Sequence, residues 1–176
     1  MLTETMTAAL NAQINKELRA FYTYLSMAAY FEDDGLKGFA AWMRHHAEEE
    51  MLHAMKIYDF VLQRRGRVTL QAIDAPRASW ESAKNAFEDA LHHEQNVTAS
   101  IHALVDTARK EGDHATETFL IWFVNEQVEE EEIVDEVLQK VTRIGDFAPA
   151  LFLLDRDLAT DAAAAATSAE GTSEGA

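Results

Sequence analysis

Residues 39–60 read FAAWMRHHAEEEMLHAMKIYDF, and this stretch decides the fold. One face of it alternates spacings of four and three residues, the pattern of a helix that packs into a bundle core. In order, that face carries Phe39, Met43, His46, Glu50, His53, Ile57 and Phe60. Its three middle positions are polar, although the pattern directs them inward. The stretch therefore predicts a bundle helix with acid and imidazole groups at mid-height.

Three other segments show the same seam, and each is interrupted by polar residues only near its middle. They read Leu10, Ile14, Glu17, Phe21, Tyr24, Ala28, Phe31; Phe87, Ala90, Glu94, Val97, Ile101, Leu104, Ala108; and Leu120, Phe123, Gln127, Glu130, Val134, Val137, Val141. Measured from the turn glycines Gly35 and Gly112, the Glu residues of the four seams and His53 lie 15 to 18 residues away along each helix. This is roughly 23–27 Å at the rise of a helix, so the breaks should meet in one layer.

The fold class that these seams predict is all-α, a four-helix bundle with one long crossover and a short fifth C-terminal helix. The expected helices span about 5–33, 36–64, 80–110, 114–143 and 146–159, with Ser79 and Asp113 as N-caps and Gly112 as a C-cap. Residues 66–79 can reach roughly 46 Å when extended, about the length of the bundle. Residues 1–160 should form one domain, and residues 161–176 a disordered tail, because that tail lacks large apolar residues.

The composition narrows the classes of function. The 176 residues include 15 Lys and Arg against 31 Asp and Glu, a formal net charge of −16, which argues against nucleic acid and favours cations as partners. There is no cysteine, so thiolate metal sites, disulfides and thiol catalysis are excluded. No signal peptide and no apolar run of membrane-spanning length is visible. A cytoplasmic protein without a membrane partner is expected.

The polar layer itself indicates a metal site. Burying several unpaired carboxylates costs many kcal/mol, and the seams contain no Lys or Arg to offset them. A pair of divalent or trivalent cations removes that cost. Oxygen ligands with one or two imidazoles and no sulfur suit iron or manganese better than structural zinc.

With these motifs in place, residues 1 to about 160 resemble the prokaryotic non-haem ferritins. The motifs are Asn15-Lys16-Glu17, Glu49-Glu50-Met51-Leu52-His53-Ala54, His93-Glu94-Gln95, Asn125-Glu126-Gln127-Val128-Glu129-Glu130 and Ala150-Leu151-Phe152-Leu153-Leu154-Asp155. The resemblance implies that Glu17, Glu50 and His53 hold a first iron. Glu50 would bridge to a second iron on Glu94 and Glu130, beside Gln127. A third iron site would use Glu49, Glu126, Glu129 and Glu130.

The resemblance also implies an activity. Fe(II) would be oxidised by O2 or hydrogen peroxide at the paired site, and the Fe(III) stored as mineral inside a homo-oligomeric shell of 24 subunits, without haem. Tyr24 would either supply an electron or simply donate a hydrogen bond in the core. The first turn of the fourth helix, with Asp113, His114 and Glu117, would lie where iron enters. The apolar side of the fifth helix would contact other subunits.

Three alternatives remain open. The fourth helix offers Gln127 and Glu130 where a bacterioferritin or a di-iron oxygenase places Glu-x-x-His. A bacterioferritin could still use Met51 for haem, and a monomeric di-iron oxidase or peroxidase would share the metal layer. In the third alternative the acids are surface groups of a non-catalytic bundle. His46 is expected to support the ligands, and His45, His92, His93, His102 and His114 to lie on the surface.

Overall fold

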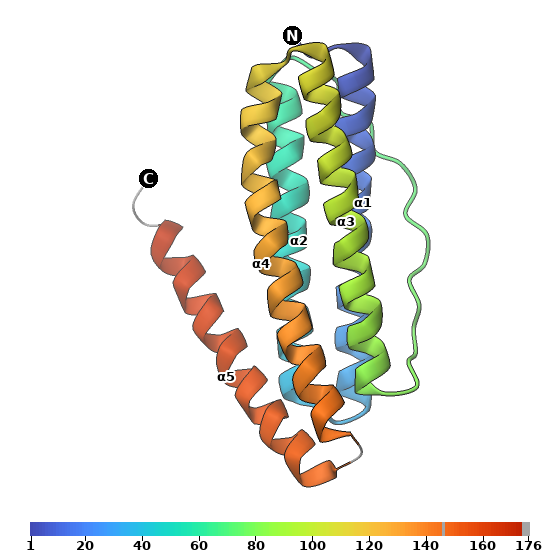
Figure 1. Cartoon of the computed structure of the whole chain (residues 1–176). Coiled ribbons are helices and arrows are strands. Elements are labelled where there is room, and N and C mark those ends of the chain that lie inside the picture. Colours follow the sequence, from blue (N-terminus) through green and yellow to red (C-terminus); the bar gives the residue numbers. More distant parts are fainter. Residues whose placement is uncertain (146, 174–176) are drawn as a thin grey trace.

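Four long helices and a fifth, C-terminal helix make up the computed structural model, which describes residues 1–145 and 147–173. Within that range there is no strand. The helices are α1 (Glu4–Asp33), α2 (Lys37–Gln63), α3 (Ala83–Glu111), α4 (His114–Ile144) and α5 (Ala148–Ser173). Figure 1 shows α1 to α4 side by side, with the crossover between α2 and α3 running the length of the bundle. Helices α2 and α3 are therefore parallel, as predicted. No described helix is both long and apolar enough to cross a membrane.

The core consists of two apolar clusters separated by a polar layer. One cluster lies toward the α1–α2 turn and includes Phe31, Phe39 and Phe87. The other lies toward the opposite end and includes Leu10, Ile57 and Phe123. The buried polar residues of the seams fall between these two sets in every helix: Glu17, His46, Glu50, His53, Glu94, Gln127 and Glu130. The expected single layer of polar breaks is therefore present.

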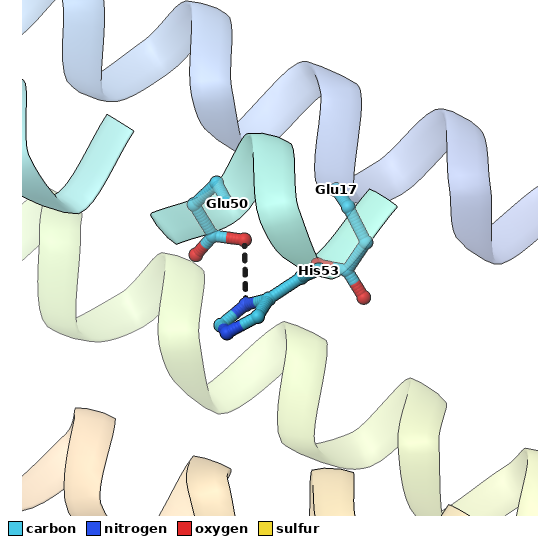
Figure 2. A group of neighbouring side chains, drawn as sticks. All are labelled: Glu17, Glu50 and His53. Carbon is cyan, nitrogen blue, oxygen red and sulfur yellow. Dashed lines mark ion pairs between the residues drawn. The ribbon is translucent and has the colours of Figure 1, made fainter. Parts of the chain in front are cut away.

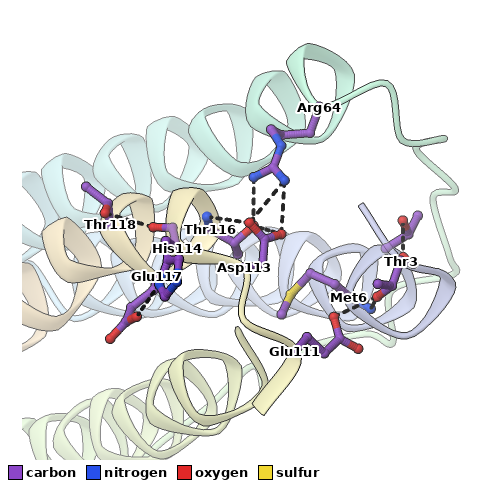
Figure 3. Close-up of polar contacts among 10 residues, drawn as sticks. Thr3, Met6, Arg64, Glu111, Asp113, His114, Thr116, Glu117 and Thr118 are labelled. Carbon is purple, nitrogen blue, oxygen red and sulfur yellow. Dashed lines mark hydrogen bonds and ion pairs between the residues drawn. The ribbon is translucent and has the colours of Figure 1, made fainter. Parts of the chain in front are cut away.

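Side-chain caps define the starts of α1, α3 and α4. Thr3 accepts from the Met6 N–H, and Asp113 accepts from the Thr116 N–H, as the sequence predicts for the start of α4. Figure 3 shows how this end is closed: the Arg64 guanidinium at the end of α2 donates to both Asp113 oxygens at 3.0 Å, and Thr3 donates to Glu111. The α3–α4 turn is thus tied to the end of α2.

The predicted start of α3 is wrong by three residues. Ser82, not Ser79, is the N-cap and accepts from the Asn85 N–H. The reason is Trp80, whose ring is buried in the first apolar cluster while its Nε1 donates to Asp89. Because this large side chain is anchored in the core, the helix begins only after it. The Ser79 carbonyl accepts a hydrogen bond from the Arg77 side chain. The tertiary contact overrides the local capping signal.

Helix α5 is longer than the expected short helix that ended near residue 159, because it continues to Ser173. The expected disorder of residues 161–176 stays a prediction, and residues 174–176 of that tail lie outside the described residues. Alanine needs no packing partner to favour a helix, and residues 162–166 are all Ala. The apolar side of α5 is also divided. Leu154 and Leu158 are buried, and α5 lies mainly along α2, whereas Phe147 and Phe152 are exposed and remain free for subunit contacts.

Candidate metal centre

The centre of the polar layer is a group of three ligand-bearing side chains from α1 and α2. One ligand atom each from Glu17, Glu50 and His53 lies within 4.8 Å of the other two, and all three side chains are buried. Figure 2 shows them pointing toward one another, with His53 Nδ1 3.5 Å from Glu50 Oε2. The spacing of three residues places Glu50 and His53 one turn apart on the same side of α2. Two oxygens of this group, Glu17 Oε2 and Glu50 Oε2, are buried and have no hydrogen-bond partner among the described residues.

Glu94 on α3 faces the same layer but is held by its neighbours. Tyr24 donates to Glu94 Oε1 at 2.5 Å, and Gln127 Nε2 lies 3.3 Å from Glu94 Oε2. Glu94 therefore does not join a ligand-distance group in the described part of the chain. It is nevertheless close enough for its charge to raise the pKa of Glu50. Tyr24 is fully buried and donates a hydrogen bond, which is one of the two roles that the sequence left open for it.

Glu130 on α4 belongs to two further groups. One consists of His46, Glu49 and Glu130, and the other of His53, Glu126 and Glu130. His46 Nδ1 lies 3.2 Å from Glu130 Oε2, so this imidazole contacts a predicted ligand. Glu49 and Glu126 are half-buried, while Glu129 is exposed and stands outside both groups. Glu49, Glu126, Glu129 and Glu130 all line one cavity of about 390 Å³ between α2, α4 and α5.

The buried acids of the layer differ in the direction in which their pKa is shifted. Burial raises the pKa of Glu50 well above its ordinary value of 4.5, and the charges of Glu94, Glu17 and Glu130 raise it further. Burial also raises the pKa of Glu17, and that of Glu94 to about 7. For Glu130, burial acts in the same direction, but the hydrogen bond and charge of His46 outweigh it and lower the pKa. Protons and a metal ion therefore compete for Glu17, Glu50 and Glu94.

The sequence reading missed two polar residues behind the ligands. Gln13 is buried on α1 and donates to Glu17 Oε1 at 2.8 Å, while its own oxygen accepts from Ser100 on α3. This pair fixes the orientation of the Glu17 carboxylate. The sequence did offer a signal for Gln13, because this residue lies one turn before Glu17. Gln13 lies outside the alternating apolar seam, however, and was therefore missed. His93 was expected on the surface, and instead its Nε2 is buried without a hydrogen-bond partner.

The comparison with protein families now decides the classification. The family model of the ferritin-like domain matches residues 7–144, which is most of the chain and includes every residue of the layer. The chain belongs to the ferritin-like family. Similar curated proteins are bacterial non-haem ferritins. One from Staphylococcus aureus is 39% identical over 160 residues, covering 91% of this chain and 96% of the relative. One from Staphylococcus saprophyticus is 40% identical over 159 residues, covering 90% and 95%.

Solved structures agree with this placement. An open pore ferritin from the hyperthermophilic archaeon Archaeoglobus fulgidus superposes with a TM-score of 0.89 at 49% identity, covering 90% of this chain and 98% of that one. A humanized archaeal ferritin gives a TM-score of 0.89 at 50% identity, covering 90% and 96%. The ferritin fold and the non-haem relationship are thereby confirmed. The assignment of individual residues of this ferritin to iron stays a prediction.

The raised pKa values predict how this ferritin should bind a divalent metal at different pH. Glu94, with a pKa of about 7, must lose its proton to become a ligand, so binding should tighten as pH rises toward 7 and level off above it. Calorimetry of anaerobic Fe(II) binding in two buffers of different ionisation enthalpy should show about one more proton released per site at pH 6 than at pH 8. Glu94→Gln is the control, and an unchanged proton release in this variant would contradict the assignment.

Proposed function

We propose that this ferritin oxidises Fe(II) at the buried polar layer and stores the Fe(III) product as mineral inside a homo-oligomeric shell of 24 subunits. One observation carries the proposal: two buried carboxylate oxygens, on Glu17 and Glu50, have no hydrogen-bond partner among the described residues at the point where four helices converge. The buried polar residues of the described chain include no Lys or Arg. A cation from outside would satisfy these oxygens, and their carboxylate and imidazole neighbours suit iron.

Different residues of the layer would hold the two iron ions. Glu17, Glu50 and His53 would hold one Fe(II), and Glu50 would be shared with a second on Glu94 and Glu130, with Gln127 beside it. Each Fe(II) gives up one electron, so the pair can reduce one O2 to hydrogen peroxide or one hydrogen peroxide to water. The carboxylates favour the product because Fe(III) is the harder ion and prefers anionic oxygen. Tyr24 donates to one oxygen of Glu94 and His46 contacts one oxygen of Glu130, so these two residues would orient the carboxylates for the second iron.

The third site and the exit of the product fit the acidic cavity between α2 and α4. Glu49, Glu126 and Glu129 line it next to Glu130, so an ion leaving the layer would meet carboxylates at each step. Asp113 is a poor iron-entry residue, since both its oxygens already accept from Arg64, whereas His114 on the same turn is exposed. A cytoplasmic location and a role for Tyr24 as an electron donor remain proposals that rest on the resemblance to the prokaryotic non-haem ferritins.

An anaerobic Fe(II) titration of the metal-free protein tests this function. Saturation near two or three Fe(II) per chain is expected, followed by fast oxidation when O2 or hydrogen peroxide is added. Size-exclusion with light scattering should show a single species of shell size. A monomer that still oxidises Fe(II) would favour the di-iron oxidase or peroxidase alternative, and a haem absorbance band the bacterioferritin alternative. Absence of saturable uptake would reject the proposal.

A further inference from the structure

A cavity of about 560 Å³ lies on the other side of the bundle from the acidic one. Its walls come from three segments: α1 with Lys16 and Arg19, the crossover at residues 75–77, and α3 with His92 and His93. Figure 1 shows the crossover passing along α1 and α3, where it covers this region. Lys16 directly precedes Glu17, and His93 directly precedes Glu94. The cavity is therefore at the height of the metal layer, behind the helices that carry those two acids.

The charge in this cavity is opposite to that of the whole chain. Acids outnumber bases 31 to 15 in the sequence, yet Lys16, Arg19 and Arg77 face Asp89 as the single acid of the lining. Asp89 is already engaged, because its Oδ2 accepts from Arg77 at 2.6 Å and from Trp80 at 2.7 Å. The Lys16 and Arg19 side chains make no ion pair or hydrogen bond within the described residues. Neither cation is thus paired directly with an acid of the described chain.

The wall formed by the crossover is fixed in place. Arg77 donates to the Ser79 carbonyl, to Asp89 and to Asn85 at 2.6–3.1 Å, and its guanidinium lies over the Trp80 ring at 5.4 Å. Opposite, His93 has a buried Nε2 without a hydrogen-bond partner. Because that nitrogen has no exposed surface, the groups that would hold an anion are the pre-arranged wall and the two cations of α1.

We propose that this cavity binds phosphate, either free or as the phosphate group of a small metabolite, through Lys16 and Arg19. The cavity is larger than one phosphate, so it has room for bridging water or for an organic substituent. Its position gives the bundle two polar openings at one height, acidic between α2 and α4 and cationic between α1 and α3. The cationic opening repels Fe(II), so its ligand is an anion rather than the iron that we propose for the layer.

Isothermal titration of the metal-free, assembled protein with inorganic phosphate tests the proposal independently of iron oxidation. The double variant Lys16→Gln/Arg19→Gln should bind phosphate at least about tenfold more weakly than the wild type, the effect of losing charge-assisted hydrogen bonds. Arg44→Gln/Lys110→Gln removes two exposed cations elsewhere and should leave binding unchanged. Tighter binding of glycerol phosphate than of phosphate would support the site and identify a phosphorylated metabolite as its ligand.

Two results would overturn the proposal. One is a wild-type protein without saturable phosphate binding below about 10 mM, a weaker affinity than a specific small-molecule site provides. A carboxylate of a neighbouring subunit seated in the cavity would produce this result. The other is equal weakening in both double variants, which would assign the binding to overall charge. Circular dichroism of both variants shows whether the bundle is intact.

Discussion

Glu50→Ala should slow the initial rate of Fe(II) oxidation at least about 100-fold, the upper range seen when even an outer partner of a metal ligand is removed. The reason is geometric. Glu50 has one oxygen 3.5 Å from His53 and lies within ligand distance of Glu17, while its pKa responds to Glu94 and Glu130 from the other two helices. It is the residue through which both halves of the layer are coupled. His53→Ala should have a similar effect, measured by stopped-flow absorbance.

Glu48→Ala is the matched control, since Glu48 is an exposed acid two residues away on the same helix. Its oxidation rate should equal that of the wild type. Both site variants should still form the helical assembly, because they leave the two apolar clusters on either side of the layer in place. Wild-type rates in both Glu50→Ala and His53→Ala would show that oxidation happens elsewhere on the protein.

Stability should change in the opposite direction to activity. Folding the metal-free chain must either bury the Glu50 charge or protonate it, and its Oε2 gains no hydrogen bond in return. Glu50→Gln keeps the shape without the charge, so we expect the metal-free protein to unfold at higher denaturant concentration, by about 1–3 kcal/mol. Such a gain together with lost oxidation is typical of a residue retained for function at the expense of stability.

The layer could be predicted from the sequence because it depends on helix periodicity and chain length alone. Glu17 and Glu50 lie at similar counts from Gly35, and Glu94 and Glu130 at equal counts from Gly112. A helix has a fixed rise, so equal counts place side chains at equal heights once the turns are known. The two turns were themselves readable from Gly and Asp. Tertiary packing then had only to bring the four faces together.

Other features depend on contacts between distant segments and could not be read in this way. The start of α3 shifted because Trp80 packs into the core, and the hydrogen bond from Ser100 to Gln13 requires α1 and α3 to be adjacent. The side chains that contact each predicted ligand are another feature of this kind. Equal heights do not reveal that Tyr24 donates to Glu94 while His46 contacts Glu130.

The cap of α2 is the clearest example, and it concerns how α5 is attached. Leu36 supplies no side-chain cap, so the first turn of α2 is capped from α5: Asp155 Oδ1 accepts from the N–H groups of Gly38 and Phe39 at 2.7 and 3.0 Å. The backbone of α5 approaches so closely that a Cβ on Gly38 would lie 1.6 Å from the Asp155 carbonyl oxygen. Only glycine permits this approach.

Gly38→Ala should therefore release α5 from the bundle. In an isolated helix the same change would stabilise by about 1 kcal/mol, because alanine favours helix over glycine. Here the clash is with backbone, which no rotamer change relieves, so α5 must move away and expose Leu154 and Leu158, each worth about 1.5–3 kcal/mol when buried. Hydrogen–deuterium exchange should show α5 losing protection while α1 to α4 keep theirs.

Two variants separate the clash from the loss of the cap. Lys37→Ala changes an exposed neighbour on the same turn and should leave the exchange of α5 unaltered. Asp155→Ala removes the cap without a clash, so it should weaken the protection of α5 by about 1–2 kcal/mol, less than Gly38→Ala does. Unchanged protection of α5 in Gly38→Ala would mean that the close approach of α5 to α2 is not what holds this helix. If the exposed Phe147 and Phe152 make subunit contacts, Gly38→Ala should also weaken the assembly, because the helix that presents them is no longer fixed.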